Sequence, residues 1–105
     1  MDWPKQVPFF TEEDVHKEEE YEIKQSGKIK RCAVGWLNHL FVDFGQYGAV
    51  DFSRRDKAES ILRKIANISK YDSIEEWNDK PKNTLKNIAD KLNKTMKELG
   101  YEVEK

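Results

Sequence analysis

Cys32 is the residue of this sequence best suited to covalent chemistry. It directly follows residues 28–31, which hold three cations, and it begins an apolar run long enough to be a helix. Nearby cations and a helix N-terminus both lower the pKa of a thiol and favour the nucleophilic thiolate. The small neighbours Ala33 and Gly35 favour the other interpretation, a buried structural cysteine where another element packs closely. Cys32 is therefore a weak candidate nucleophile.

A cysteine hydrolase also needs a base, and an orienting group for that base. His39 lies seven residues after Cys32, about 10 Å away along a helix, which is too far for direct contact. A folded-back His16 is the other candidate base, and Asn78 or Asp79 could orient it. His39 and Asp43 have the spacing of a shared metal site, but two ligands are too few. We expect no metal and no cofactor.

The run Trp77-Asn78-Asp79 could bind a nucleotide-like ligand. An indole stacks on a base or sugar ring, an amide reads a base edge, and a carboxylate binds a ribose hydroxyl. In the structural interpretation Trp77 anchors a short helix, Asn78 forms a turn, and Asp79 caps a final helix whose first turn contains Pro81. The residues that we predict to line a ligand pocket are His39, Tyr47, Trp77, Asn78 and Asp79.

The first part of the chain must position these residues with short elements. Residues 1–10 contain two prolines and read as an extended arm, whose Phe9-Phe10 pair we expect to dock on the body formed by residues 11–105. Thr11 and the acids after it indicate the start of a short helix. Alternation of apolar and polar residues on both sides of Ser26-Gly27 favours a β-hairpin over residues 21–31. A longer helix from residue 11 to residue 25 is the alternative.

The remainder of the sequence reads as helices. The apolar run over residues 32–44 predicts a buried helix. Residues 45–48 indicate a turn with Tyr47 as a lid. Ser53 is the expected cap of the next helix, which has one apolar stripe. Ser73 and Glu76 match a capping box that starts a short helical turn ending near Trp77. The last helix carries a stripe, ends at Gly100 and precedes a short edge strand; its stripe residues are Leu85, Ile88, Leu92, Met96 and Leu99. The predicted fold is α+β and mostly helical, with three to four helices around one core and a small β-hairpin.

Composition limits the class of protein. The chain has 105 residues, 37% of them charged, with a formal net charge of −1, and its mean hydropathy is −0.92. This length suits a single domain. No apolar run is long enough to span a membrane, and the start Met1-Asp2-Trp3-Pro4 does not resemble a secretory signal. One cysteine cannot form an internal disulfide. We therefore expect a cytoplasmic protein.

The charges are unevenly distributed along the chain. Residues 12–22 hold seven acids and one lysine, whereas residues 80–97 hold six lysines and one acid. A basic helix can bind phosphates, so a nucleic-acid-binding accessory protein is one alternative. However, the lysines surround the helix and no arginine joins them, which argues against nucleic acid. The stripe of the last helix either packs inside the monomer, which we favour, or forms a homodimer seam.

Two motifs together resemble a family of short bacterial and phage proteins of unknown function. The first is Arg31-Cys32-Ala33-Val34-Gly35-Trp36-Leu37, and the second is Ser73-Ile74-Glu75-Glu76-Trp77-Asn78-Asp79-Lys80-Pro81. The family has a Cys-Ala-x-Gly-Ala-Leu stretch and, some forty residues later, a Trp-Asn-Asp segment that leads into a final helix. The resemblance covers residues 28–99 and implies a shared fold but no activity.

The function that the sequence favours is therefore binding rather than catalysis. The small size, the abundant aromatic residues and the incomplete catalytic set suit a protein that captures a partner. That partner is either a small nucleotide-like ligand, held as a sponge against a host signal, or a host protein that is inhibited. A cysteine-dependent hydrolase with Cys32 as nucleophile is the enzymatic alternative.

Overall fold

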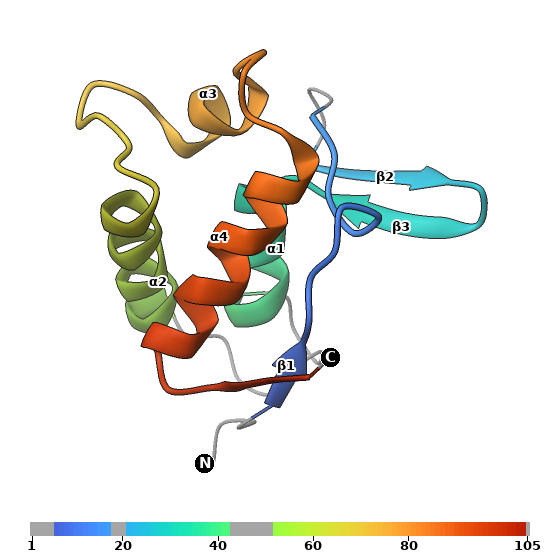
Figure 1. Ribbon diagram of the computed structural model, residues 1–105. Coiled ribbons are helices and arrows are strands. Elements are labelled where there is room, and N and C mark those ends of the chain that lie inside the picture. Colours follow the sequence, from blue (N-terminus) through green and yellow to red (C-terminus); the bar gives the residue numbers. More distant parts are fainter. Residues whose placement is uncertain (1–5, 18–20, 43–51, 105) are drawn as a thin grey trace.

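Helices form most of the fold in the computed structural model, which describes residues 6–17, 21–42 and 52–104 (Figure 1). The helices are α1 (Ala33–Phe41), α2 (Phe52–Ile65), α3 (Ile74–Asp79) and α4 (Leu85–Glu98). The strands are β1 (Gln6–Pro8), β2 (Glu22–Gln25), β3 (Lys28–Arg31) and β4 (Glu102–Glu104). The predicted class, α+β and mostly helical with a small hairpin, is confirmed. No helix within these ranges has both the length and the apolar character needed to cross a membrane.

One hydrophobic core lies between the helices. Helix α4 packs against α2, and α1 packs against both α2 and α3. The stripe on α4 faces this core, which confirms the favoured use of that stripe inside the monomer. The fully buried side chains at the centre include Leu37, Leu62, Ile74, Ile88, Leu92 and Met96.

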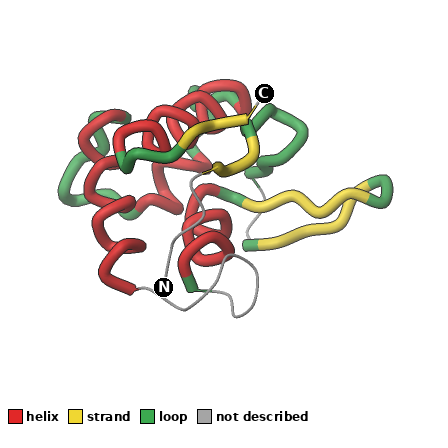
Figure 2. The backbone as a smooth tube through the Cα atoms, turned by 90° about the horizontal axis from the view of Figure 1, so that it is seen from below, coloured by secondary structure: helices red, strands yellow, loops and turns green. Residues whose placement is uncertain are grey.

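The predicted hairpin is confirmed, and the longer helix over residues 11–25 is excluded. Strands β2 and β3 are antiparallel, and Gln25 pairs with Lys28 across the turn. Ser26 and Gly27 have φ angles of 52° and 79°. Two consecutive positive φ values define the type I′ turn, whose twist matches that of a two-stranded ribbon. The hairpin projects from the helical body (Figures 1 and 2).

The N-terminal arm docks on the body through its backbone and through Phe10. Strand β1 pairs in parallel with β4, so the first and last strands that the structure describes lie side by side. The side-chain amide of Asn93 accepts a hydrogen bond from the Phe10 N–H and donates one to the Phe10 carbonyl, at 2.8 and 2.9 Å. Phe10 is 1% exposed, whereas Phe9 remains on the surface. The predicted docking therefore holds for one of the two phenylalanines.

Three local predictions about helix boundaries were wrong. Thr11 starts a turn rather than a helix. The Thr11 N–H donates a hydrogen bond to the Asp14 carboxylate at 2.8 Å, and this bond stabilises the turn. Helix α3 continues past Trp77 to Asp79, so Asp79 ends a helix instead of capping one. Thr84, whose hydroxyl accepts a hydrogen bond from the Asn87 N–H, is the cap of α4.

Helices α1 and α2 also differ in detail from their predicted limits. Helix α2 begins at Phe52, so Ser53 lies inside its first turn. The predicted helix over residues 32–44 is confirmed for Ala33–Phe41. The predicted turn at residues 45–48, and Tyr47 with it, lies outside the described residues.

Candidate functional site

Cys32 is the N-cap of α1 and is almost completely buried. Its sulfur accepts a hydrogen bond from the Gly35 N–H at 3.5 Å. Gly35 allows this packing, because a Cβ at that position would overlap the carbonyl oxygen of Tyr21. The small residues after Cys32 thus let the backbone at the base of the hairpin approach the helix closely.

The electrostatic environment of Cys32 does not activate it. Burial raises the pKa of the Cys32 thiol, and the carboxylates of Asp79 and Glu75 raise it further, while the backbone N–H groups of Gly35 and Val34 oppose the shift. This direction is opposite to the lowered pKa that the nearby cations led us to expect. A protonated thiol is a poor nucleophile, so Cys32 does not have the lowered pKa that the cysteine hydrolase alternative requires.

Asn78 joins three parts of the chain at the junction between α1 and α3. Its side-chain oxygen accepts a hydrogen bond from the Ala33 N–H at 2.9 Å, and its nitrogen donates to the His16 carbonyl at 3.0 Å and to the Asp79 carboxylate at 2.9 Å. Asn78 is 0% exposed. The side chain is therefore occupied by the protein itself, and it satisfies a backbone N–H in the first turn of α1 that no helical carbonyl can reach.

The structure gathers some of the predicted site residues and separates others. Cys32, Asn78 and Asp79 lie together, and His16 joins them through its carbonyl. Trp77 is buried in the core beside Asn78, while the Asp79 residue is exposed. His39 lies two turns along α1 and meets the ring of Trp36 edge-on, with 5.7 Å between the ring centroids. Their role in ligand binding stays a prediction.

Polar residues that the sequence analysis passed over complete this junction. Lys17 donates hydrogen bonds to the carbonyls of Lys80 at 2.5 Å and Asn83 at 2.7 Å, and so fixes the turn between α3 and α4. The buried amide of Asn83 donates to the Trp77 carbonyl at 2.9 Å. The two contacts of Lys17 join residues more than sixty positions apart, which no local pattern reveals. Within the described ranges, no group of three or more His, Cys, Asp or Glu residues could hold a metal ion.

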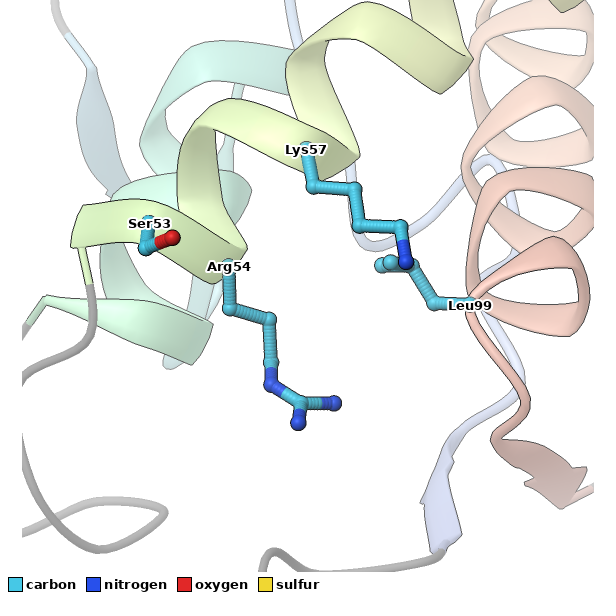
Figure 3. Close-up of a pocket in the computed structure, with 4 residues that line it drawn as sticks. All are labelled: Ser53, Arg54, Lys57 and Leu99. Atoms are coloured by element: carbon cyan, nitrogen blue, oxygen red, sulfur yellow. The ribbon is translucent and has the colours of Figure 1, made fainter.

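A cleft with a different character lies on the other side of the core, where the start of α2 faces the end of α4 (Figure 3). Its volume is about 350 Å³, and the residues that line it are Ser53, Arg54, Lys57 and Leu99. Figure 3 shows the long side chains of Arg54 and Lys57 on either side of the opening. Two cations and a hydroxyl therefore line this cleft, and Leu99 provides its apolar surface.

The position of Arg54 is supported by an aromatic ring. Its guanidinium lies 5.9 Å from the ring centroid of Tyr101 and donates a hydrogen bond to the Tyr101 hydroxyl at 3.3 Å. Tyr101 is itself buried, so its ring has a fixed place. A guanidinium in contact with an aromatic face loses fewer orientations when it binds an anion than a freely moving one.

On the face of α2 that points away from the cleft, the charged side chains are paired with one another. Arg55 and Arg63 both pair with Glu59, at 2.7 and 3.6 Å, as i and i+4 neighbours on the helix. Lys57, by comparison, forms no ion pair with any residue that the structure describes. Among the described residues, the charge of Lys57 on the cleft face is therefore not paired, whereas Arg55 and Arg63 on the other face are paired with Glu59. In the sequence, Ser53, Arg54 and Lys57 lie within five residues of each other, but nothing in the sequence shows which part of α4 faces them.

Comparison of the chain with protein-family models, with curated proteins and with solved structures found no match.

Proposed function

We propose that the protein binds a small ligand that carries phosphate groups, and that the cleft between α2 and α4 holds those groups. The observation that carries this proposal is that Arg54 and Lys57 line one cleft to which no acidic residue among the described lining residues contributes. Guanidinium and ammonium groups are the usual protein partners of phosphate oxygens. The volume of about 350 Å³ lies at the lower end of the range for small-molecule sites.

The chemical class of this ligand agrees with the nucleotide-like molecule expected from the sequence, but the residues differ. The phosphates would contact Arg54 and Lys57, with the Ser53 hydroxyl as a further donor. Leu99 offers an apolar surface for a non-phosphate part of the ligand. Binding without turnover is the proposed activity, because the candidate nucleophile Cys32 is buried with a raised pKa and is not among the lining residues.

Native mass spectrometry of the protein with matched ligands tests the ligand chemistry. Adenosine diphosphate and adenosine share one base and one sugar and differ in the phosphates alone. We expect a mass shift that corresponds to bound adenosine diphosphate, and no shift with adenosine at the same concentration. Equal binding of both molecules would contradict a phosphate site and would indicate a site for the base or the sugar. Binding of neither would contradict it as well and would favour a protein partner, which pull-down from a lysate would then identify.

A further inference from the structure

The outer edge of β2 is open in the part of the chain that the structure describes. The sheet order there is β2-β3, so each strand has the other as its only strand partner. At the base of the hairpin, β3 has a second contact, a parallel bridge between Val15 and Arg31. Figure 2 shows the hairpin extending away from the helices, with both strands at the periphery of the molecule. A two-stranded hairpin has little stability of its own in water.

The register of the hairpin determines which backbone groups point outward from β2. In an antiparallel pair, residues alternate between facing the partner strand and facing away. The Tyr21 carbonyl accepts a hydrogen bond from the Cys32 N–H at 3.2 Å, and the turn closes at the Gln25–Lys28 pair. Tyr21, Ile23 and Gln25 therefore face β3, and the N–H and C=O groups of Glu22 and Lys24 point outward.

The same alternation explains why β3 offers less of an edge. The Arg31 N–H points outward and donates a hydrogen bond to the Asp14 carbonyl at 3.0 Å. The segment before the hairpin therefore occupies the base of that edge. The edge of β2 has no corresponding backbone partner among the described residues. An exposed strand edge of this kind is a template for another extended chain.

From the sequence of this edge we infer that β2 pairs with β2 of a second copy of the chain. If two β2 strands run antiparallel about a two-fold axis at Ile23, Glu22 lies opposite the partner's Lys24, and Lys24 lies opposite the partner's Glu22. This is also the register in which the outward N–H and C=O groups of these residues meet each other. Glu22 already pairs with Arg31 of its own chain at 2.9 Å, so the partner's Lys24 would join an existing ion pair. A one-residue slip would lose both opposite-charge pairs between the copies.

This dimer is an isologous one, because the same edge serves both subunits. It forms a four-stranded sheet with the order β3-β2-β2-β3. A strand of four residues makes a small interface, so association in the micromolar range or weaker is expected. The dimer does not involve the cleft between α2 and α4. The test of the dimer is therefore independent of the test of phosphate binding.

Sedimentation equilibrium from micromolar to millimolar concentration, with charge variants, tests this inference. We expect wild type to dimerise, and we expect Lys24→Glu alone and Glu22→Lys alone to weaken the dimer about tenfold, because each places like charges opposite one another. Mixing the two variants restores opposite charges at both positions and should regain a heterodimer. Such rescue also excludes misfolding as the reason for the loss. Lys30→Glu is the matched control, since it makes the same change of charge at a position that lies opposite Ile23.

A proline pair tests the backbone contribution. Lys24→Pro removes an outward N–H from β2, and Ile29→Pro removes one from the opposite edge of the hairpin. We expect Lys24→Pro to abolish the dimer and Ile29→Pro to leave it. A wild-type chain that stays monomeric at millimolar concentration overturns the inference. Equal weakening by Lys24→Glu and Lys30→Glu, with no rescue in the mixture, overturns it as well.

Discussion

The junction of α1 with α3 and the cleft between α2 and α4 use polar side chains in opposite ways. At the junction, Asn78 is fully buried, and its oxygen and nitrogen are bonded to the protein. At the cleft, Arg54 and Lys57 border a space large enough for a small molecule. A buried polar group with satisfied hydrogen bonds holds the fold together. Lys57, by contrast, is exposed beside the cleft and forms no ion pair with the described residues.

Substitution of Asn78 at the junction of α1 with α3 should have the largest effect on stability. Asn78→Ala leaves the Ala33 N–H and the His16 carbonyl buried without their partner, and each lost bond costs about 1–3 kcal/mol. We expect the free energy of unfolding, measured by urea denaturation, to fall by about 3 kcal/mol. Asp79→Ala removes only one of the three hydrogen bonds of Asn78 and should cost about 1 kcal/mol, less than Asn78→Ala. Equal losses in the two variants would show that Asn78 is not the residue that joins the elements.

A smaller and pH-dependent effect is expected at Cys32. The folded protein raises the pKa of this thiol above the ordinary value of 9.0, so the unfolded chain loses the proton first as the pH rises. The contribution of the thiol to stability is complete below pH 9.0 and is lost as the pH rises through the folded pKa. Cys32→Ser has no such thiol, and serine is a favoured N-cap, so at neutral pH the variant should lie within about 1 kcal/mol of wild type.

Urea denaturation of wild type and Cys32→Ser across this pH range provides the measurement. The pKa of Tyr21 is raised mainly by the Glu75 carboxylate and to a smaller extent by the charge of Cys32, so the difference between the two proteins reports Cys32 together with this coupling. We expect the difference to shift against wild type above pH 9.0. A difference that does not change with pH would contradict the raised pKa of the thiol, and a fast reaction of Cys32 with a maleimide at neutral pH would indicate an activated thiolate.

The smallest effect on stability is expected at the cleft. Lys57 is exposed and forms no ion pair with the described residues, so Lys57→Gln should change the free energy of unfolding by less than about 0.5 kcal/mol. Thermal unfolding with and without pyrophosphate measures both properties at once. Pyrophosphate should raise the midpoint of wild type more than that of Lys57→Gln. A large loss of stability without any ligand would assign Lys57 to the fold rather than to a site.

Local patterns in the sequence were sufficient for the elements that depend on neighbours in the chain. The Ser26-Gly27 turn, the Ser73–Glu76 capping box and the apolar stripe of α4 are each complete within one short segment. The capping box is present with both of its hydrogen bonds, at 3.0 and 3.2 Å. These features fold as predicted because each is satisfied by residues a few positions away.

The predictions were wrong or incomplete where distant residues decide the outcome. Thr11 has the residue type of a helix cap, but Asp14 binds the Thr11 N–H and the segment continues into the contact with β3. Strands β1 and β4 pair although they are far apart in the sequence. The hydrogen bonds between Asn93 and Phe10 likewise join residues 83 positions apart. The cleft was missed for the same reason, because Leu99 meets Arg54 and Lys57 only in the folded protein.

The Trp77-Asn78-Asp79 motif shows how a distinctive sequence can have a structural use. Its aromatic and amide residues are of the types that read nucleotides, and composition alone does not separate the two uses. Trp77 is 7% exposed and Asn78 is 0% exposed, so both side chains contribute to the folded core. Their role in ligand binding stays a prediction.

The central claim, a phosphate-binding cleft at Arg54 and Lys57, is tested most directly by calorimetric titration of pyrophosphate into three proteins. These are wild type, Lys57→Gln, and Lys64→Gln, whose lysine is exposed on the same helix and does not line the cleft. We expect wild type and Lys64→Gln to bind alike and Lys57→Gln to bind at least about tenfold more weakly, as the loss of one charged hydrogen bond predicts. No binding to wild type, or equal weakening in both variants, would contradict the claim.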